Sequence, residues 1–104
     1  METVMPSAKP KARFQNGQIV LVSTNTQSNS TKLNLDARPY INQIGTVVGR
    51  QPRSMASPYY IVKFDDNNTV RVISLFLRGP FKTKEVAQKY QANPSMDIDS
   101  NDLG

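Results

Sequence analysis

The chain lacks two residue types on which protein chemistry often depends. Its 104 residues include no cysteine and no histidine. Without cysteine there are no disulfides, no thiolate metal sites and no cysteine nucleophile. Without histidine, the commonest metal ligand and the usual general base are missing, so zinc sites built from these residues are excluded.

Other catalytic signals are scarce as well. Serine and threonine are plentiful, but no base is placed in the sequence to activate one, and no glycine-rich phosphate loop is present. Asp65 and Asp66 are adjacent carboxylates, yet a Mg²⁺ or Ca²⁺ site needs more converging oxygens, so we interpret them as turn formers. We therefore expect a protein that binds rather than catalyses, with no cofactor and no metal.

Long apolar runs are also missing. No stretch approaches the roughly 18 apolar residues of a membrane span. Residues 1–6 have no apolar core of the kind that a signal peptide carries. We expect a cytoplasmic monomer without membrane insertion.

The chain does carry basic charge, with a formal net charge of +5. The segment 14–81 has three acidic residues against seven basic ones, of which five are arginine, the better residue for bidentate contacts with anions. This balance is compatible with an anionic partner, although many proteins are equally basic without one.

Composition divides the chain into four segments. Residues 1–13 predict a disordered basic tail, 14–81 a single folded domain, and 93–104 a disordered acidic tail. Between them, 82–92 predicts a short helix with Thr83 as its N-cap and Asn93-Pro94 at its end, and the alternative is a frayed polar segment.

The domain predicts five strands, at 18–23, 45–50, 59–64, 69–73 and 78–81. A long loop at 24–38 and a second loop at 51–58 separate the first three, and 74–77 predicts one short turn. The expected core residues are apolar or aromatic side chains on one face of these strands and beside them: Tyr60, Val62, Phe64, Val70, Val72, Phe14, Phe76 and Phe81.

The turn between the third and fourth strands sets which side chains face each other. An even-numbered loop would place Phe64 opposite Thr69 and mix apolar with polar residues on one face. A three-residue loop, 66–68, places Phe64 opposite Val70 and keeps one face apolar. We predict the three-residue loop.

This register sets Lys63 directly opposite Arg71 on the outer face. Like charges in that position are destabilising unless something negative lies between them. A phosphate backbone would satisfy both, and the alternative is that they extend into water or meet Asp65.

The order of these elements resembles a known fold. The runs Gly17-Gln-Ile-Val-Leu-Val, Ile44-Gly-Thr-Val-Val, Tyr60-Ile-Val-Lys-Phe and Val70-Arg-Val resemble the five-stranded SH3-like barrel of KOW-type and Tudor-type modules. The stretches from Tyr40 to Val47 and from Ile61 to Asp65 are similar to PsaE-type photosynthetic SH3-like subunits. The first resemblance implies binding of RNA or nucleoprotein, and the second implies docking onto other proteins.

We therefore predict an all-β, small five-stranded SH3-like barrel that binds RNA, DNA or a nucleoprotein complex. The alternative is an accessory subunit that docks onto a protein assembly through its loops. The candidate binding residues are cations on one face and two aromatic stacking platforms: Arg38, Arg50, Arg53, Lys63, Arg71, Tyr59 and Tyr40. Tyr40, at the end of a loop, has a structural alternative, and Tyr59 is the stronger candidate because it is expected to share the outer face with Lys63.

Overall fold

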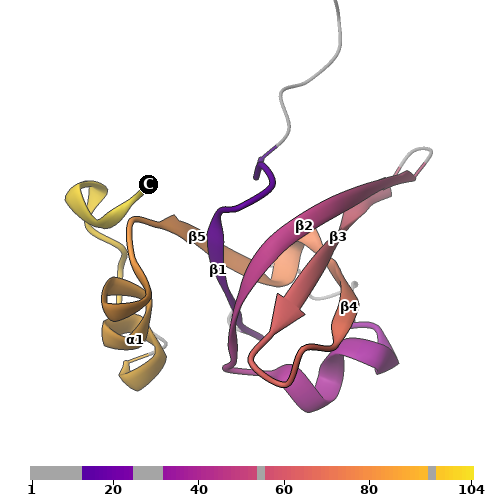
Figure 1. Ribbon diagram of the computed structural model, residues 1–104, viewed down its shortest axis with the longest axis horizontal. Helices are drawn as coiled ribbons and strands as arrows, with labels where there is room; N and C mark the ends of the chain where they lie inside the picture. The colour runs from indigo at the N-terminus through magenta and orange to yellow at the C-terminus, as the bar shows by residue number, and fades with distance from the viewer. Residues whose placement is uncertain (1–12, 25–31, 54–55, 94–95) are drawn as a thin grey trace, which may run out of the picture.

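The structure, a computed structural model, describes residues 13–24, 32–53, 56–93 and 96–104. Its strands and helices follow the chain in this order: β1 (Ile19–Val22), the 3₁₀ helix η1 (Leu35–Tyr40), β2 (Ile44–Arg53), β3 (Ala56–Phe64), β4 (Thr69–Ile73), the 3₁₀ turn η2 (Ser74–Phe76), β5 (Leu77–Phe81), α1 (Lys84–Ala92) and the 3₁₀ turn η3 (Ser100–Asp102) (Figure 1).

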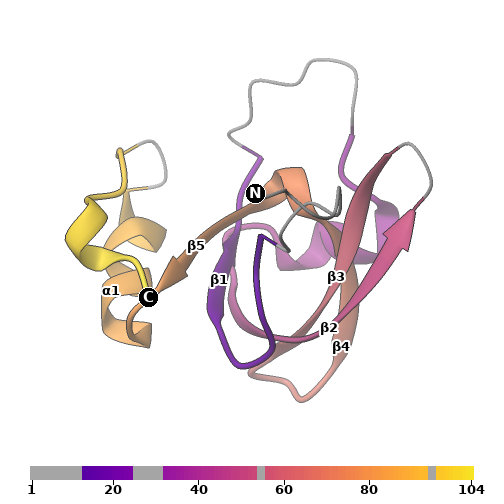
Figure 2. The same cartoon turned by 90° about the horizontal axis from the view of Figure 1, so that it is seen from above.

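The five strands form one antiparallel sheet in the order β4-β3-β2-β1-β5. The expected all-β class with five strands is confirmed. The expected closure is not, because β4 and β5 lie at opposite ends of this order. Turn η2 redirects the chain after β4, so that β5 pairs with β1 and the sheet stays open between β4 and β5 (Figure 2).

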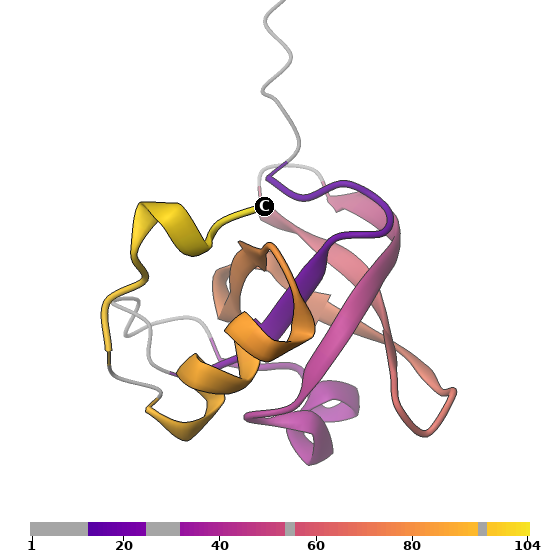
Figure 3. The same cartoon turned by 60° about the vertical axis from the view of Figure 1, so that its left-hand side comes forward.

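Strand β1 is buried on both sides, which explains its uninterrupted apolar sequence. Val20 and Val22 contribute to the main core, whereas Leu21 lies in a second cluster with Tyr90 of α1. Figure 3 shows α1 lying beside β1 and β5, outside the curve of the sheet. One side of β1 is therefore buried in the main core, around which the sheet curves, and the other side is covered by α1.

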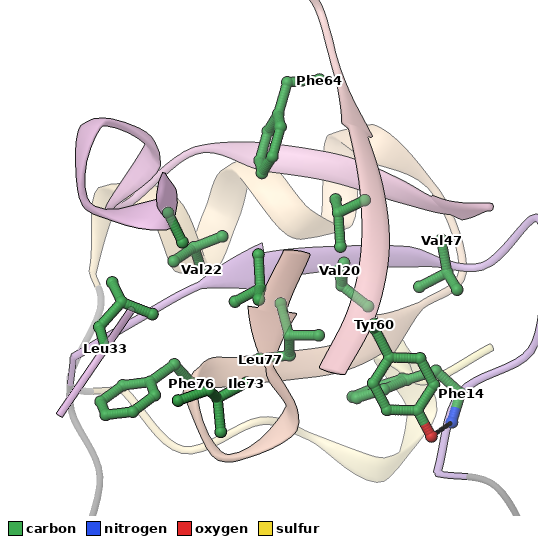
Figure 4. Close-up of a cluster of buried hydrophobic side chains, with 13 residues drawn as sticks. Phe14, Val20, Val22, Leu33, Val47, Tyr60, Phe64, Ile73, Phe76 and Leu77 are labelled. Atoms are coloured by element: carbon green, nitrogen blue, oxygen red, sulfur yellow. Dashed lines mark hydrogen bonds between the residues drawn. The ribbon is translucent and has the colours of Figure 1, made fainter. Parts of the chain in front are cut away.

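The main core contains most of the residues expected there. Tyr60, Val62 and Val72 are at most 1% exposed, and Phe14 packs edge-on against Tyr60 with 5.2 Å between the ring centroids (Figure 4). Val70 is half-buried against this core. The apolar faces of β3 and β4 were thus correctly predicted.

The β3–β4 turn has the predicted length but a different position. The loop comprises Asp65–Asn67, one residue earlier than expected, and Val62 rather than Phe64 lies opposite Val70. Asn67 adopts a positive φ of 66° while its N–H donates to the carbonyl of Phe64. Asparagine tolerates this left-handed conformation, and the early turn still leaves the apolar faces in register.

The segment 51–58, expected as a loop, is largely strand. Strands β2 and β3 continue through Arg53 and from Ala56, so the hairpin runs beyond the rest of the sheet (Figure 1). The register shifts between Val47 and Gly49 and again between Gln51 and Arg53. Such bulges let a strand bend while it stays paired, which a reading of local composition does not reveal.

The helix after the sheet forms as predicted. Thr83 accepts a hydrogen bond from the backbone N–H of Val86, and α1 ends before Asn93. Residues 82–92 are therefore not a frayed segment.

The C-terminal residues differ from the expectation of a disordered tail. Met96 and Ile98 pack against the second cluster, and Leu103 forms a β-bridge with Phe81. Tyr90 supplies the reason, since its hydroxyl donates to Asp102 and accepts from the N–H of Asp99. These contacts join residues 96–104 to the domain.

The predicted basic tail falls mostly outside the described residues, which begin at 13. Arg13 itself is not part of a disordered tail. Its guanidinium donates to the carbonyl oxygens of Ser74 and Leu77, the second at 2.7 Å, and its backbone N–H donates to the hydroxyl of Tyr60 at 2.9 Å.

Candidate nucleic-acid interface

Three of the candidate residues meet beside the half of the β2–β3 hairpin that is nearer its turn. The guanidinium carbon of Arg53 lies 4.5 Å from the ring centroid of Tyr59, and that of Arg71 lies 5.0 Å from it. These distances fall within the range of cation–π contacts. We call Arg53, Tyr59 and Arg71 the Tyr59 cluster.

Strand pairing explains how distant residues form this cluster. Tyr59 pairs with Ile73 of β4, so Arg71, two residues earlier on β4, is its neighbour on the same face. Arg53 ends β2, and its Nε donates to the carbonyl of Ser57 at 2.7 Å, which holds the guanidinium near β3. Tyr59 is half-buried against the core, so the cluster has a fixed base.

Arg71 also makes an ion pair with Asp36 of η1. Nη2 of Arg71 lies 3.5 Å from Oδ2 of Asp36, and the two side chains are 47% and 65% exposed. An exposed pair of this kind contributes at most about 1 kcal/mol. Arg71 is therefore positioned by Asp36 but can exchange it for another anion at little cost.

The predicted juxtaposition of Lys63 with Arg71 does not occur. Lys63 lies opposite Thr69, and Arg71 lies opposite Ile61, because the β3–β4 turn begins one residue early. Both cations remain on the outer face of the sheet, separated along it rather than facing each other. The repulsion that the sequence suggested is absent from this pair.

Arg50 belongs to a different face. The register shift between Val47 and Gly49 places Arg50 opposite Tyr60, whose side chain is in the core. Paired residues share a face of the sheet, so Arg50 points to the side opposite the Tyr59 cluster, where the hairpin extends past the core and leaves it exposed. Regular alternation could not have revealed this change of face.

Tyr40 is built into the fold at the end of η1. Its ring stacks on Phe64 with centroids 4.2 Å apart and an interplanar angle of 20°. Its hydroxyl donates to Oδ2 of Asp66 at 2.7 Å and accepts from Nδ2 of Asn68 at 3.3 Å. The hydrogen bond between Tyr40 and Asp66 raises the pKa of Tyr40 and lowers the pKa of Asp66. Tyr40 thus ties η1 to the β3–β4 turn.

Arg38, also on η1, is exposed at its surface. Its Nε donates to the carbonyl of Leu33 at 3.4 Å, a long hydrogen bond. No contact in the described residues joins it to the Tyr59 cluster. Of the seven predicted residues, the structure brings three into direct contact.

A cavity of about 430 Å³ lies next to the Tyr59 cluster, between η1 and β4. Arg71 belongs both to the cavity lining and to the Tyr59 cluster. The cavity is lined by aromatic, apolar, polar and charged side chains: Asp36, Tyr40, Asn68, Thr69, Val70 and Arg71. Local sequence patterns do not predict this cavity, because η1 lies in a segment expected to be an irregular loop.

Nowhere among the residues that the structure describes do three or more aspartate or glutamate side chains converge in a way that could hold a metal ion. Within the same residues, no helix has the length and apolar character needed to cross a membrane.

Comparison of the chain with protein-family models, with curated proteins and with solved structures gives no match.

Proposed function

We propose that the protein is a non-enzymatic module that binds nucleic acid, and single strands in preference to duplex, through the Tyr59 cluster. The observation that carries the proposal is the placement of two guanidinium groups over one aromatic ring. Unpaired bases stack on aromatic rings and on guanidinium planes, and bases inside a duplex are not free to do so.

Charge on the same face supports the proposal. Arginine binds phosphate through a planar fork of N–H donors, and the cluster offers two such groups. Lys63 lies on the same face of β3. The chain as a whole carries a net charge of +5, which favours encounter with a polyanion.

The resemblance to KOW-type modules supports the same proposal, since those modules bind RNA or nucleoprotein. The strand order and the 3₁₀ turn between β4 and β5 are features that an SH3-like relative would have.

Salt dependence of binding tests the proposal. Three basic side chains, Arg53, Lys63 and Arg71, give about three phosphate contacts, which predict a log–log slope of affinity against salt of about −2 for a single strand. Fluorescence anisotropy with labelled oligothymidylate, oligouridylate and duplex, between about 50 and 200 mM salt, measures it. Absence of binding at the lowest salt would overturn the proposal and favour a protein partner.

A matched pair of variants locates the surface. Arg53→Gln and Arg50→Gln remove the same charge from the same strand, but only Arg53 belongs to the Tyr59 cluster. We expect Arg53→Gln to weaken binding about tenfold and Arg50→Gln about twofold or less, since Arg50 acts only through long-range attraction. Equal losses in the two variants would contradict the placement of the site.

A further inference from the structure

The cavity beside the Tyr59 cluster has the dimensions of a small binding site. Ligand pockets span about 300–1,000 Å³, and this one, at about 430 Å³, is near the lower limit. A space of this size fits one planar ring system rather than a folded peptide segment. Because Arg71 belongs both to the cavity and to the Tyr59 cluster, a strand bound at the cluster would pass the cavity mouth.

The walls of the cavity suit a nucleobase. Tyr40 provides an aromatic wall that stacking on Phe64 and the hydrogen bond to Asp66 hold in place before any ligand arrives. Val70, half-buried, adds an apolar surface. Preorganised walls reduce the entropy lost when a ligand binds.

The rim of the cavity carries the groups that would distinguish one base from another. Asp36 contributes a carboxylate that is 65% exposed, and Arg71 contributes a guanidinium 3.5 Å away. A phosphate that binds Arg71 would release Asp36 from the ion pair. The carboxylate is then an acceptor of two N–H groups at the edge of the space where a base would lie.

We infer that this cavity is a subsite for a single unpaired guanine, an inference that rests on the proposed function. Guanine is the common base with two adjacent N–H donors, N1–H and the N2 amino group, on its Watson–Crick edge, and a carboxylate accepts both at once. Adenine, cytosine and thymine or uracil each present a lone-pair acceptor beside their donor, which the carboxylate repels. Asp36 therefore selects guanine, while the Tyr59 cluster binds any sequence.

Oligonucleotides that differ at one base test this subsite. The probes are a labelled oligothymidylate of about ten nucleotides and the same strand with one central guanine, adenine, cytosine or hypoxanthine. We expect guanine to bind about tenfold more tightly than the other standard bases, the discrimination typical of one bidentate contact. Hypoxanthine keeps N1–H but lacks the N2 amino group, so it should lose most of that advantage. The same series in RNA shows whether the sugar matters.

Two carboxylate variants provide the controls. Asp36→Asn should abolish the guanine preference and strengthen binding of plain oligothymidylate slightly, because the anion beside Arg71 is gone. Asp97→Asn removes an exposed carboxylate of the C-terminal segment and should retain the preference. Both positions are exposed, so both variants are expected to fold.

The outcomes separate the two proposals. A guanine preference that disappears in Asp36→Asn and persists in Asp97→Asn supports the subsite. Salt-dependent binding with equal affinity for the four bases would overturn the subsite and leave the proposed function standing. Failure of every strand to bind at low salt would overturn both.

Discussion

The guanidinium of Arg71 lies between the ring of Tyr59, at 5.0 Å, and the carboxylate of Asp36, at 3.5 Å. The first contact belongs to the sheet and the second to η1, a segment more than thirty residues away in sequence. Arg71 therefore links the Tyr59 cluster to the cavity between η1 and β4. An anion that replaces Asp36 would meet both features at once.

The aromatic ring of Tyr59 should matter more than its hydroxyl. Tyr59→Leu keeps an apolar side chain against the core but removes the stacking face, and we expect affinity for a single strand to fall about tenfold. Tyr59→Phe keeps the ring and should bind within about twofold of the native protein. Anisotropy titration measures both, and a larger loss in Tyr59→Phe than in Tyr59→Leu would contradict stacking.

The close packing at Gly45 predicts a large loss of stability. A Cβ at this position would lie 2.4 Å from Cγ1 of Val62 and 2.9 Å from the carbonyl oxygen of Lys63. Gly45→Ala should lower the free energy of unfolding by more than about 2 kcal/mol, because backbone as well as side chain must shift.

Gly49 provides the matched control on the same strand. Its Cβ would come no closer than 3.3 Å, to Cγ1 of Ile61, so Gly49→Ala should cost less than about 1 kcal/mol. Urea denaturation of the two variants measures the difference. Equal costs would contradict the close approach of Gly45 to Val62 and to the backbone of Lys63.

Arg13 should stabilise the fold through its hydrogen bonds rather than take part in binding. Its guanidinium donates to the carbonyls of Ser74 and Leu77, residues that are themselves buried. Arg13→Gln removes the guanidinium donors from both carbonyls, leaving that of Ser74 with only the backbone N–H of Leu77, and should lower the free energy of unfolding by about 1–2 kcal/mol. Arg50→Gln, with the same loss of charge, should change it by less than about 0.5 kcal/mol. Comparable unfolding midpoints for the two variants would contradict this role.

These cases show which features a single sequence reveals. Alternation in β3 correctly assigned Tyr60 and Val62 to the core, because a sheet with one buried face allows only one parity of register. The same reasoning could not determine whether the three-residue loop begins at residue 65 or at residue 66, since Asp and Asn both favour turns. The residue that adopts the left-handed conformation is Asn67. Because the loop begins one residue earlier than predicted, Lys63 and Arg71 do not lie opposite each other.

Long-range contacts account for the remaining errors. Arg50 changed face because of a bulge, which depends on the bending of the paired strands and not on a local pattern. The acidic composition of the C-terminal residues predicts disorder, because composition does not indicate the hydrogen bond from Tyr90 to Asp102. The contacts of Arg53 and Arg71 with Tyr59 depend on the β2–β3 hairpin, whose outer part the sequence predicts as a loop.

That C-terminal contact predicts a pH dependence. The hydrogen bond from Tyr90, reinforced by Lys89 at 3.2 Å, lowers the pKa of Asp102. A carboxyl group with a lower pKa in the folded state stabilises that state above its unfolded pKa, and the stabilisation is lost as the pH falls through the folded pKa. The docking of residues 96–104 should therefore be complete at neutral pH and weaken below about pH 4.

Backbone amide shifts of residues 99–104, followed by two-dimensional NMR as the pH is lowered, measure this transition. Asp102→Asn should remove the transition, and Asp97→Asn, which alters an exposed carboxylate, should keep it. Identical titrations of this segment in the native protein and in Asp102→Asn would contradict the assignment.

Binding of single-stranded nucleic acid at the Tyr59 cluster is tested most directly by NMR mapping with isotope-labelled protein. Addition of oligothymidylate should shift the signals of Arg53, Tyr59 and Arg71 in a saturable manner and leave those of Arg50 nearly unchanged. Shifts centred on Arg50, or shifts spread evenly over all exposed lysines and arginines, would contradict the claim.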